Sequence, residues 1–191
     1  MVLFSKGKTV PMEEMRMTEW FWNFIVYSFF GYLLERLFAA AVRSENQIRR
    51  CFWLLPLCPV YGLAVTAVLA LPPGLLRLPW LPVWGGIVTT TVEYAVHWVY
   101  DRALGVQFWD YSPLRFHIHG RVCLSFSIAW GSLVTAAVLF VQPTLDALTA
   151  AIPPTMTFAA VLLVTADGLI TIRYLAETRD VTFTVPRRRA A

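Results

Sequence analysis

Acidic side chains interrupt three separate apolar runs of this sequence: Glu35, Glu93 and Asp167. A charged residue at the centre of a membrane-spanning helix costs about 2.5–3.5 kcal/mol on insertion scales, so such residues face a bundle interior or a water-filled cavity. Carboxylates that meet there could transfer protons or line a path for an ion or small molecule. A purely structural role, in which each acid pairs with an Arg or His and fixes packing, stays open, above all for Asp167.

Polar residues recur at helical spacing around these acids. The spacing i, i+4, i+8 places Thr89, Glu93 and His97 on one face of a helix. Gly31 lies four residues before Glu35 and would let a second helix approach closely. We expect these faces to turn toward each other at one depth of the membrane, in its cytoplasmic half.

Composition requires that such helices lie in a bilayer. The chain has 191 residues, of which 58% are hydrophobic and only 15% charged, whereas about 25% is usual for soluble domains. The net charge of +4 reflects arginines between the apolar runs, where they mark topology. We therefore expect no nucleic acid among the partners, which begin with the lipid bilayer.

The predicted fold class is an all-α integral membrane protein, a bundle of about five transmembrane helices with a Pro-broken second helix. A bilayer core of ~30 Å requires about 20 apolar residues in a helix. The segments that qualify are Trp20–Val42, Trp53–Leu71, Leu81–Tyr100, Val122–Val141 and Met156–Leu175. The predicted organisation is an N-terminal segment (1–19) outside the cytoplasm, a transmembrane domain (20–175) and a basic tail (176–191).

The distribution of Lys and Arg predicts the orientation. Loops 43–52 and 101–121 and the tail share one side and carry ten basic residues, against four on the other side. The positive-inside rule therefore predicts a cytoplasmic C-terminus in the cell membrane. A second segment that enters and leaves on the same side would reverse this.

The second segment contains Pro56 and Pro59 inside an apolar run. Proline removes a backbone donor and clashes with the preceding turn, so a break that frees carbonyl groups is expected. Broken backbone at membrane depth is tolerated where protein or a cavity satisfies it, as in transporter sites. A simple bend at a helix start is the alternative.

The loop between the third and fourth segments contains "FWDYSP" and "HGR". Asp110 and Pro113 have turn chemistry, and Gly120 allows close backbone approach. Arg121 then enters the membrane end and is a candidate bidentate partner for Glu35 or Glu93. Arg50 is a second candidate.

Several other chemistries lack their motifs. The spacing of His117, His119 and Cys123 is not a zinc pattern, so no metal and no cofactor is expected. No GxxxxGK[ST] motif or nucleophile elbow is present, so an enzymatic role is not favoured. The cysteines at 51, 58 and 123 make no CxxC pair and are expected to be reduced thiols.

Five segments occur in the order of a known family: "YSFFGYLLERLF", "RRCFWLLPLCPVYG", "TVEYAVHWV", "FWDYSP" and "HGRVCLSFSIAWG". Together they resemble bacterial membrane proteins of the putative ABC-transporter type IV family, over positions from about 20 to 135. Tyr32 stands where the family pattern has Trp, and Cys51 and Leu55 replace glycines of that pattern. The resemblance implies a permease of the bacterial inner membrane, with a separate ATPase as partner.

The resemblance also implies a set of functional residues, to which the helical stripe adds His97. The predicted substrate or functional network is Glu35, Arg50, Cys58, Pro59, Tyr61, Gly62, Glu93, His97, Trp109, Asp110, Tyr111, Gly120 and Arg121.

Three functions follow for this network. The first is a permease-like protein with a buried Glu/Arg network at a cytoplasm-facing cavity, for passage of a small molecule or ion. The second is a membrane-embedded enzyme or lipid-handling protein that acts on a substrate from the inner leaflet. The third is a scaffold without transport. Since five spans are few for a transport path, a homodimer is also expected.

Overall fold

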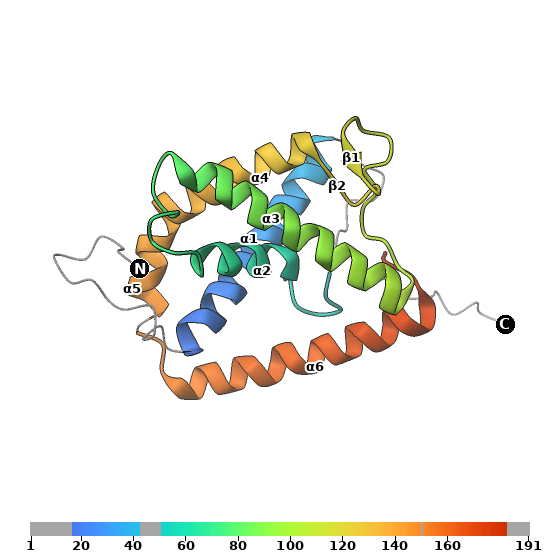
Figure 1. The fold of residues 1–191 in the computed structure, drawn as a ribbon. Helices are drawn as coiled ribbons and strands as arrows, with labels where there is room; N and C mark the ends of the chain where they lie inside the picture. Colours follow the sequence, from blue (N-terminus) through green and yellow to red (C-terminus); the bar gives the residue numbers. More distant parts are fainter. Residues whose placement is uncertain (1–16, 43–50, 150, 183–191) are drawn as a thin grey trace.

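The structure is a computed structural model that describes residues 17–42, 51–149 and 151–182. Its α-helices are α1 (Met17–Ala41), α2 (Pro59–Leu69), α3 (Trp80–Val99), α4 (Leu124–Ala136), α5 (Gln142–Thr149) and α6 (Pro154–Thr178). Single π-helical turns, η2 (Tyr100–Leu104) and η3 (Ala137–Val141), follow α3 and α4. Strands β1 (His117–Ile118) and β2 (Val122–Cys123) form a short antiparallel hairpin. Figure 1 shows a helical bundle with α6 along one side.

Glycines bring α1 and α2 into close contact at the centre of the bundle. The side chain of Tyr61 occupies the space that a Cβ of Gly31 would need, and Gly62 faces the backbone oxygen of Phe24. This confirms the close helix approach predicted at Gly31. The Cys58 amide also donates to the carbonyl oxygen of Ser28 at 2.9 Å, so α2 begins beside the middle of α1.

Glycines also bring α3 and α4 together. A Cβ on Gly131 would lie 2.5 Å from the carbonyl oxygen of Pro82, and Gly86 lies on the other side of the same contact. The apolar core joins this pair to α1, α2 and α5 through Tyr27, Val65, Val68, Leu69, Leu81, Val134, Val138 and Leu145.

The buried face of α6 is polar and its outer face is apolar. Asp167 and Thr171 are buried, whereas Phe158, Leu163 and Leu169 are each more than 60% exposed. A soluble helix has the opposite arrangement. This distribution suits a helix whose outer face meets lipid.

Three described helices are long and apolar enough to cross a membrane: α1 (Met17–Ala41), the continuous stretch of α4, η3 and α5 (Leu124–Thr149), and α6 (Thr155–Thr178). The α3 helix is not among these three helices. It has 20 residues and includes the polar residues Glu93 and His97. The fold is therefore an all-α membrane bundle, as predicted.

The second predicted span differs from a continuous helix over Trp53–Leu71. Residues Cys51–Cys58 are not helical, and α2 contains only 11 residues. At 1.5 Å per residue α2 is about 16 Å long, roughly half a bilayer core. Pro59 occupies the first turn, where its missing N–H does no harm. The break predicted from the prolines is present, and it occupies the first residues of the segment, up to Cys58.

Candidate functional site

Tyr61 connects α2 to the first of the predicted acids. Its phenol donates a 2.7 Å hydrogen bond to Oε1 of Glu35 on α1. The ring packs edge-on against Trp130 of α4, with 4.8 Å between ring centroids. The family motif residues Glu35 and Tyr61, which are 26 positions apart, therefore meet directly.

Glu93 is buried in α3 and accepts hydrogen bonds from two aromatic side chains. The Tyr111 phenol donates to Oε1 at 2.9 Å, and Nε1 of Trp130 donates to Oε2 at 3.1 Å. Tyr111 lies outside the membrane segments, and burial raises the pKa of its phenol well above the usual range. The phenol therefore stays protonated and remains a donor to Glu93.

Both carboxylates line one cavity of about 360 Å³. Its walls come from α1, α2, α3 and α4, from the loop after η2, and from residue 181 beyond α6. Among the predicted network, six residues line it: Glu35, Cys58, Tyr61, Glu93, Trp109 and Tyr111. Of the three acids predicted to face a common space, Glu35 and Glu93 line this cavity, whereas Asp167 does not.

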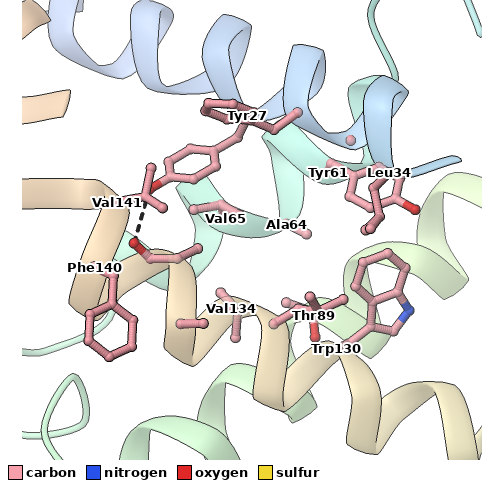
Figure 2. A pocket seen from close by; sticks show the side chains of 15 residues that line it. Tyr27, Leu34, Tyr61, Ala64, Val65, Thr89, Trp130, Val134, Phe140 and Val141 are labelled. Carbon is pink, nitrogen blue, oxygen red and sulfur yellow. Dashed lines mark hydrogen bonds between the residues drawn. The ribbon is translucent and has the colours of Figure 1, made fainter. Parts of the chain in front are cut away.

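A second cavity, also of about 360 Å³, adjoins the acidic one and is lined almost entirely by apolar side chains. The two share Leu34, Tyr61, Trp130 and Leu133. Figure 2 shows Tyr61 and Trp130 at one end of this cavity and Tyr27 with Phe140 at the other. The aromatic pair therefore stands between a polar space and an apolar one.

The loop between η2 and α4 folds back on itself and brings its two motifs together. The Tyr111 amide donates to the Gly120 carbonyl at 2.7 Å, and Asp110 accepts from the amide and hydroxyl of Ser112. Gly120 has a φ of 68°, and a Cβ there would lie 2.7 Å from Asp110 Oδ1. Only glycine adopts this backbone conformation without strain. The folded loop in turn holds Tyr111 next to Glu93.

His97 and Trp109 attach this loop to α3. Nε2 of His97 donates to the carbonyl oxygen of Trp109 at 3.0 Å, because a carbonyl can only accept. The Trp109 indole in turn donates to the carbonyl oxygen of Arg121 at 2.9 Å. These residues hold the loop in place beside the cavity.

Arg121 has a different partner from the one that the sequence suggested. Its guanidinium forms a 2.8 Å ion pair with Asp101 in η2 and donates to the Tyr94 phenol at 3.0 Å. The Arg121 hydrogen bond, with a second one from Gln107, holds the pKa of Asp101 below its usual range. Arg121 therefore fixes the end of α3, and it does not line the acidic cavity. Arg50, the other candidate, lies outside the described residues.

Asp167 accepts hydrogen bonds from the backbone of the broken segment. The amide of Leu55 donates to Oδ2 at 2.7 Å, and the amide of Leu54 is 3.1 Å from both oxygens. The amide of Trp53 donates to the Thr171 hydroxyl at 3.0 Å. We expected the break to leave carbonyl groups without helical partners. The structure shows that backbone N–H groups are also left, and that side chains of α6 accept their hydrogen bonds. These contacts agree with a structural role for Asp167, although the partners are backbone amides and not the Arg or His that the alternative named.

The structure contains a second buried polar cluster that we did not predict from the sequence. Gln142 is fully buried, accepts from the Tyr27 phenol at 2.8 Å, and donates to Asn23 at 3.2 Å. Its amide also donates to Asp146 at 2.7 Å. Asn23 and Tyr27 are spaced i, i+4 in the first apolar run, and that signal was available. Cys51 and Trp130 were also missed as cavity-lining residues.

Within the described ranges, no group of three or more His, Cys, Asp or Glu side chains could hold a metal ion. The arrangement is instead one of carboxylates held by phenol and indole donors in a partly enclosed space. Such a site can bind a group with positive charge or with hydrogen-bond donors.

The fold and the site define a helical membrane protein with an acidic, aromatic-lined cavity between its helices. The chain belongs to the putative ABC-transporter type IV family, whose model matches residues 22–172. This agrees with the resemblance seen in the sequence and is consistent with a component of a membrane transporter. No match was found among curated proteins or among solved structures.

Proposed function

We propose that this protein is the membrane-embedded permease subunit of a transporter, and that its acidic cavity binds the transported ligand. The observation that carries the proposal is the position of Glu35 and Glu93 on different helices around one space of about 360 Å³. A buried carboxylate is unfavourable unless a partner compensates its charge. The two donors to Glu93 are neutral, so a cationic ligand would complete its environment.

The adjoining apolar cavity defines the other end of this ligand. Because Tyr61 and Trp130 line both spaces, a ligand could place a cationic group near Glu93 and an apolar portion beyond the aromatic pair. The ligand class is therefore an organic cation with an apolar part.

Glu93→Gln tests the proposal in the full chain reconstituted into lipid nanodiscs. The probes are alkylammonium ions of graded chain length, each compared with the corresponding neutral alcohol, and the measurement is the thermal unfolding midpoint. We expect the cations to raise the midpoint of the wild type, and to lose at least ten-fold in apparent affinity in Glu93→Gln.

Glu177→Gln is the matched control, because Glu177 is exposed on α6 and forms an i,i+4 ion pair with the exposed Arg173. It should bind like the wild type. Equal stabilisation of the wild type and Glu93→Gln by the cations would contradict the proposed site.

Lipid handling is the second candidate, and the apolar cavity favours it. An acyl chain could occupy the space lined by Leu34, Leu133 and Phe140. Arg121 is less suited to hold a lipid phosphate, because this arginine pairs with Asp101. Copurified lipid, identified by mass spectrometry and displaced by Leu133→Trp, would support this candidate.

The remaining parts of the proposal concern the protein's partners and its cellular location. A separate ATPase would dock on loops 43–52 and 101–121, the permease would form a homodimer, and both would reside at the inner membrane of a bacterium. Copurification with a P-loop ATPase encoded by a neighbouring gene tests the first part. Native mass spectrometry from nanodiscs tests the second.

A further inference from the structure

Two cysteine side chains meet in the wall of the acidic cavity. Sγ of Cys51 lies 2.7 Å from Sγ of Cys58, and both residues line the same space as Glu35 and Glu93. Cys58 is buried and Cys51 is half-buried. A disulfide bond measures about 2.05 Å, so the two sulfur atoms need to approach by only roughly 0.7 Å to bond.

The backbone at Cys58 and between the two cysteines is held by other elements. The Cys58 amide donates to the Ser28 carbonyl of α1, and the amides of Leu54 and Leu55 are held by Asp167 of α6. The segment between the cysteines is therefore anchored while the thiols face each other. Such an arrangement favours an intramolecular bond over reaction with another molecule.

We propose that Cys51 and Cys58 form a redox-active dithiol in the cavity wall, which a peroxide converts to a disulfide. The first thiolate attacks a peroxide oxygen, the O–O bond breaks, and a sulfenic acid and one water form. The second thiol then attacks the sulfenic sulfur, the S–S bond forms, and a second water leaves. Two protons and two electrons pass from the thiols to the peroxide. Two molecules of a small thiol then reduce the disulfide to the dithiol and become a disulfide themselves.

The disulfide would change the site that the permease proposal uses, but its formation does not depend on that proposal. Cys58 directly precedes α2, whose Tyr61 donates to Glu35. Bonding Cys58 to Cys51 removes two thiol hydrogens from the cavity wall and locks the broken segment to the start of α2.

Thiol counting tests this on the purified full chain. The protein, reduced and then freed of reductant, is treated with hydrogen peroxide, denatured in acid, labelled with N-ethylmaleimide and weighed by mass spectrometry. The chain has 3 cysteines, so the reduced protein should carry three labels and the oxidised protein one. Dithiothreitol should restore all three.

Cys123→Ala is the matched control, because Cys123 Sγ lies 3.3 Å from the Ser125 hydroxyl and not beside a thiol of the pair. Its label count should fall from two to zero, whereas Cys51→Ser should keep two labels under the same treatment. Chymotryptic peptides of the oxidised wild type should contain residues 51 and 58 in one cross-linked species, which needs no variant. Three labels after peroxide treatment, or a disulfide-linked dimer in place of the internal bond, would overturn the proposal.

Discussion

At the scale of single residues, the acids of this protein accept hydrogen bonds from different kinds of donor. Glu93 accepts from a phenol and an indole, and Glu35 accepts from a phenol. Asp167 instead accepts from backbone amides. The partners therefore separate Glu35 and Glu93, which line the cavity, from Asp167, which holds the backbone of another segment.

Replacing Asp167, which does not line the acidic cavity itself, should destabilise the fold. Hydrogen bonds to charged groups contribute about 1.5–3 kcal/mol each, and unpaired buried amides add a desolvation penalty. We expect Asp167→Ala to lower the thermal unfolding midpoint clearly, and Asp167→Asn to lower it less because one carbonyl oxygen remains. Thermal unfolding in detergent measures both, with Glu177→Gln as the control. An unchanged midpoint in Asp167→Ala would show that the amides find other partners.

The Asp101–Arg121 pair should make stability depend on pH. The folded-state pKa of Asp101 is lowered, so the unfolded chain binds the proton more tightly. The contribution is present above about pH 3.9, the ordinary Asp value, and is lost as pH falls through the lower folded value. We expect Asp101→Asn to unfold at a lower temperature than the wild type at pH 7, with the difference shrinking below about pH 4. A difference that stays constant down to pH 3 would argue against the ion pair as its source.

The sequence predicted the acids better than their partners. The i, i+4, i+8 spacing identified Thr89, Glu93 and His97 because helical periodicity is local, and all three are buried. The partners of Asp167 lie 112 and 113 positions away and are backbone groups of a non-helical segment. No side-chain pattern marks them. Arg121 was assigned to the wrong acid because Asp101 lies at the end of a helix, outside the apolar run.

At the scale of elements, glycine contacts determine how closely the helices pack. The α1–α2 and α3–α4 crossings each depend on positions where a Cβ would overlap the facing helix. Without a hydrophobic driving force between helices in lipid, this close packing is a main source of association. The glycines were visible in the sequence, but the pairing of Gly62 with Phe24 requires knowing that α2 starts at the middle of α1.

Gly62→Ala should separate α1 from α2. The added methyl group would lie 2.4 Å from the backbone oxygen of Phe24 and 2.3 Å from the Ser28 hydroxyl oxygen. Overpacking of this kind usually destabilises by about 1–3 kcal/mol. Thermal unfolding should show this loss, together with weaker binding at the adjoining cavity.

Gly74→Ala is the matched control, since nothing lies within 4 Å of a Cβ built at Gly74. We expect it to unfold within experimental error of the wild type. If both variants unfold at the same temperature, then the helices adjust at little cost and the contact is not tight.

At the scale of the whole molecule, the chain reaches the far end of the bundle with a helix of only 11 residues in its second passage. The non-helical residues 51–58 form a loop that leads into α2 (Figure 1). The count of Lys and Arg on each side assumed that the second segment crosses the membrane. Residues 51–69 are compatible with that assumption, because they lead from the end of α1 toward the start of α3. The cytoplasmic position of the C-terminus stays a prediction from the positive-inside rule.

Fusions at the C-terminus test that orientation. A fluorescent protein that folds only in the cytoplasm should be bright when attached after residue 191, and alkaline phosphatase at the same position should be inactive. Replacing the three arginines at 187–189 with glutamine should reduce the bias only slightly, since loops 43–52 and 101–121 keep theirs. An active phosphatase fusion would place the tail outside and reverse the proposed docking face for the ATPase.

The anchoring of residues 53–55 by α6 sets an order for biogenesis. Residues 53–55 leave the ribosome long before Asp167, so their amides enter the membrane without their final acceptor. Until α6 arrives, water or the translocation machinery must solvate them, since bare amides in hydrocarbon are unfavourable. The early segments can therefore complete their fold only after the last helix has been made, and a chain that ends before residue 154 should be handed to quality-control proteases.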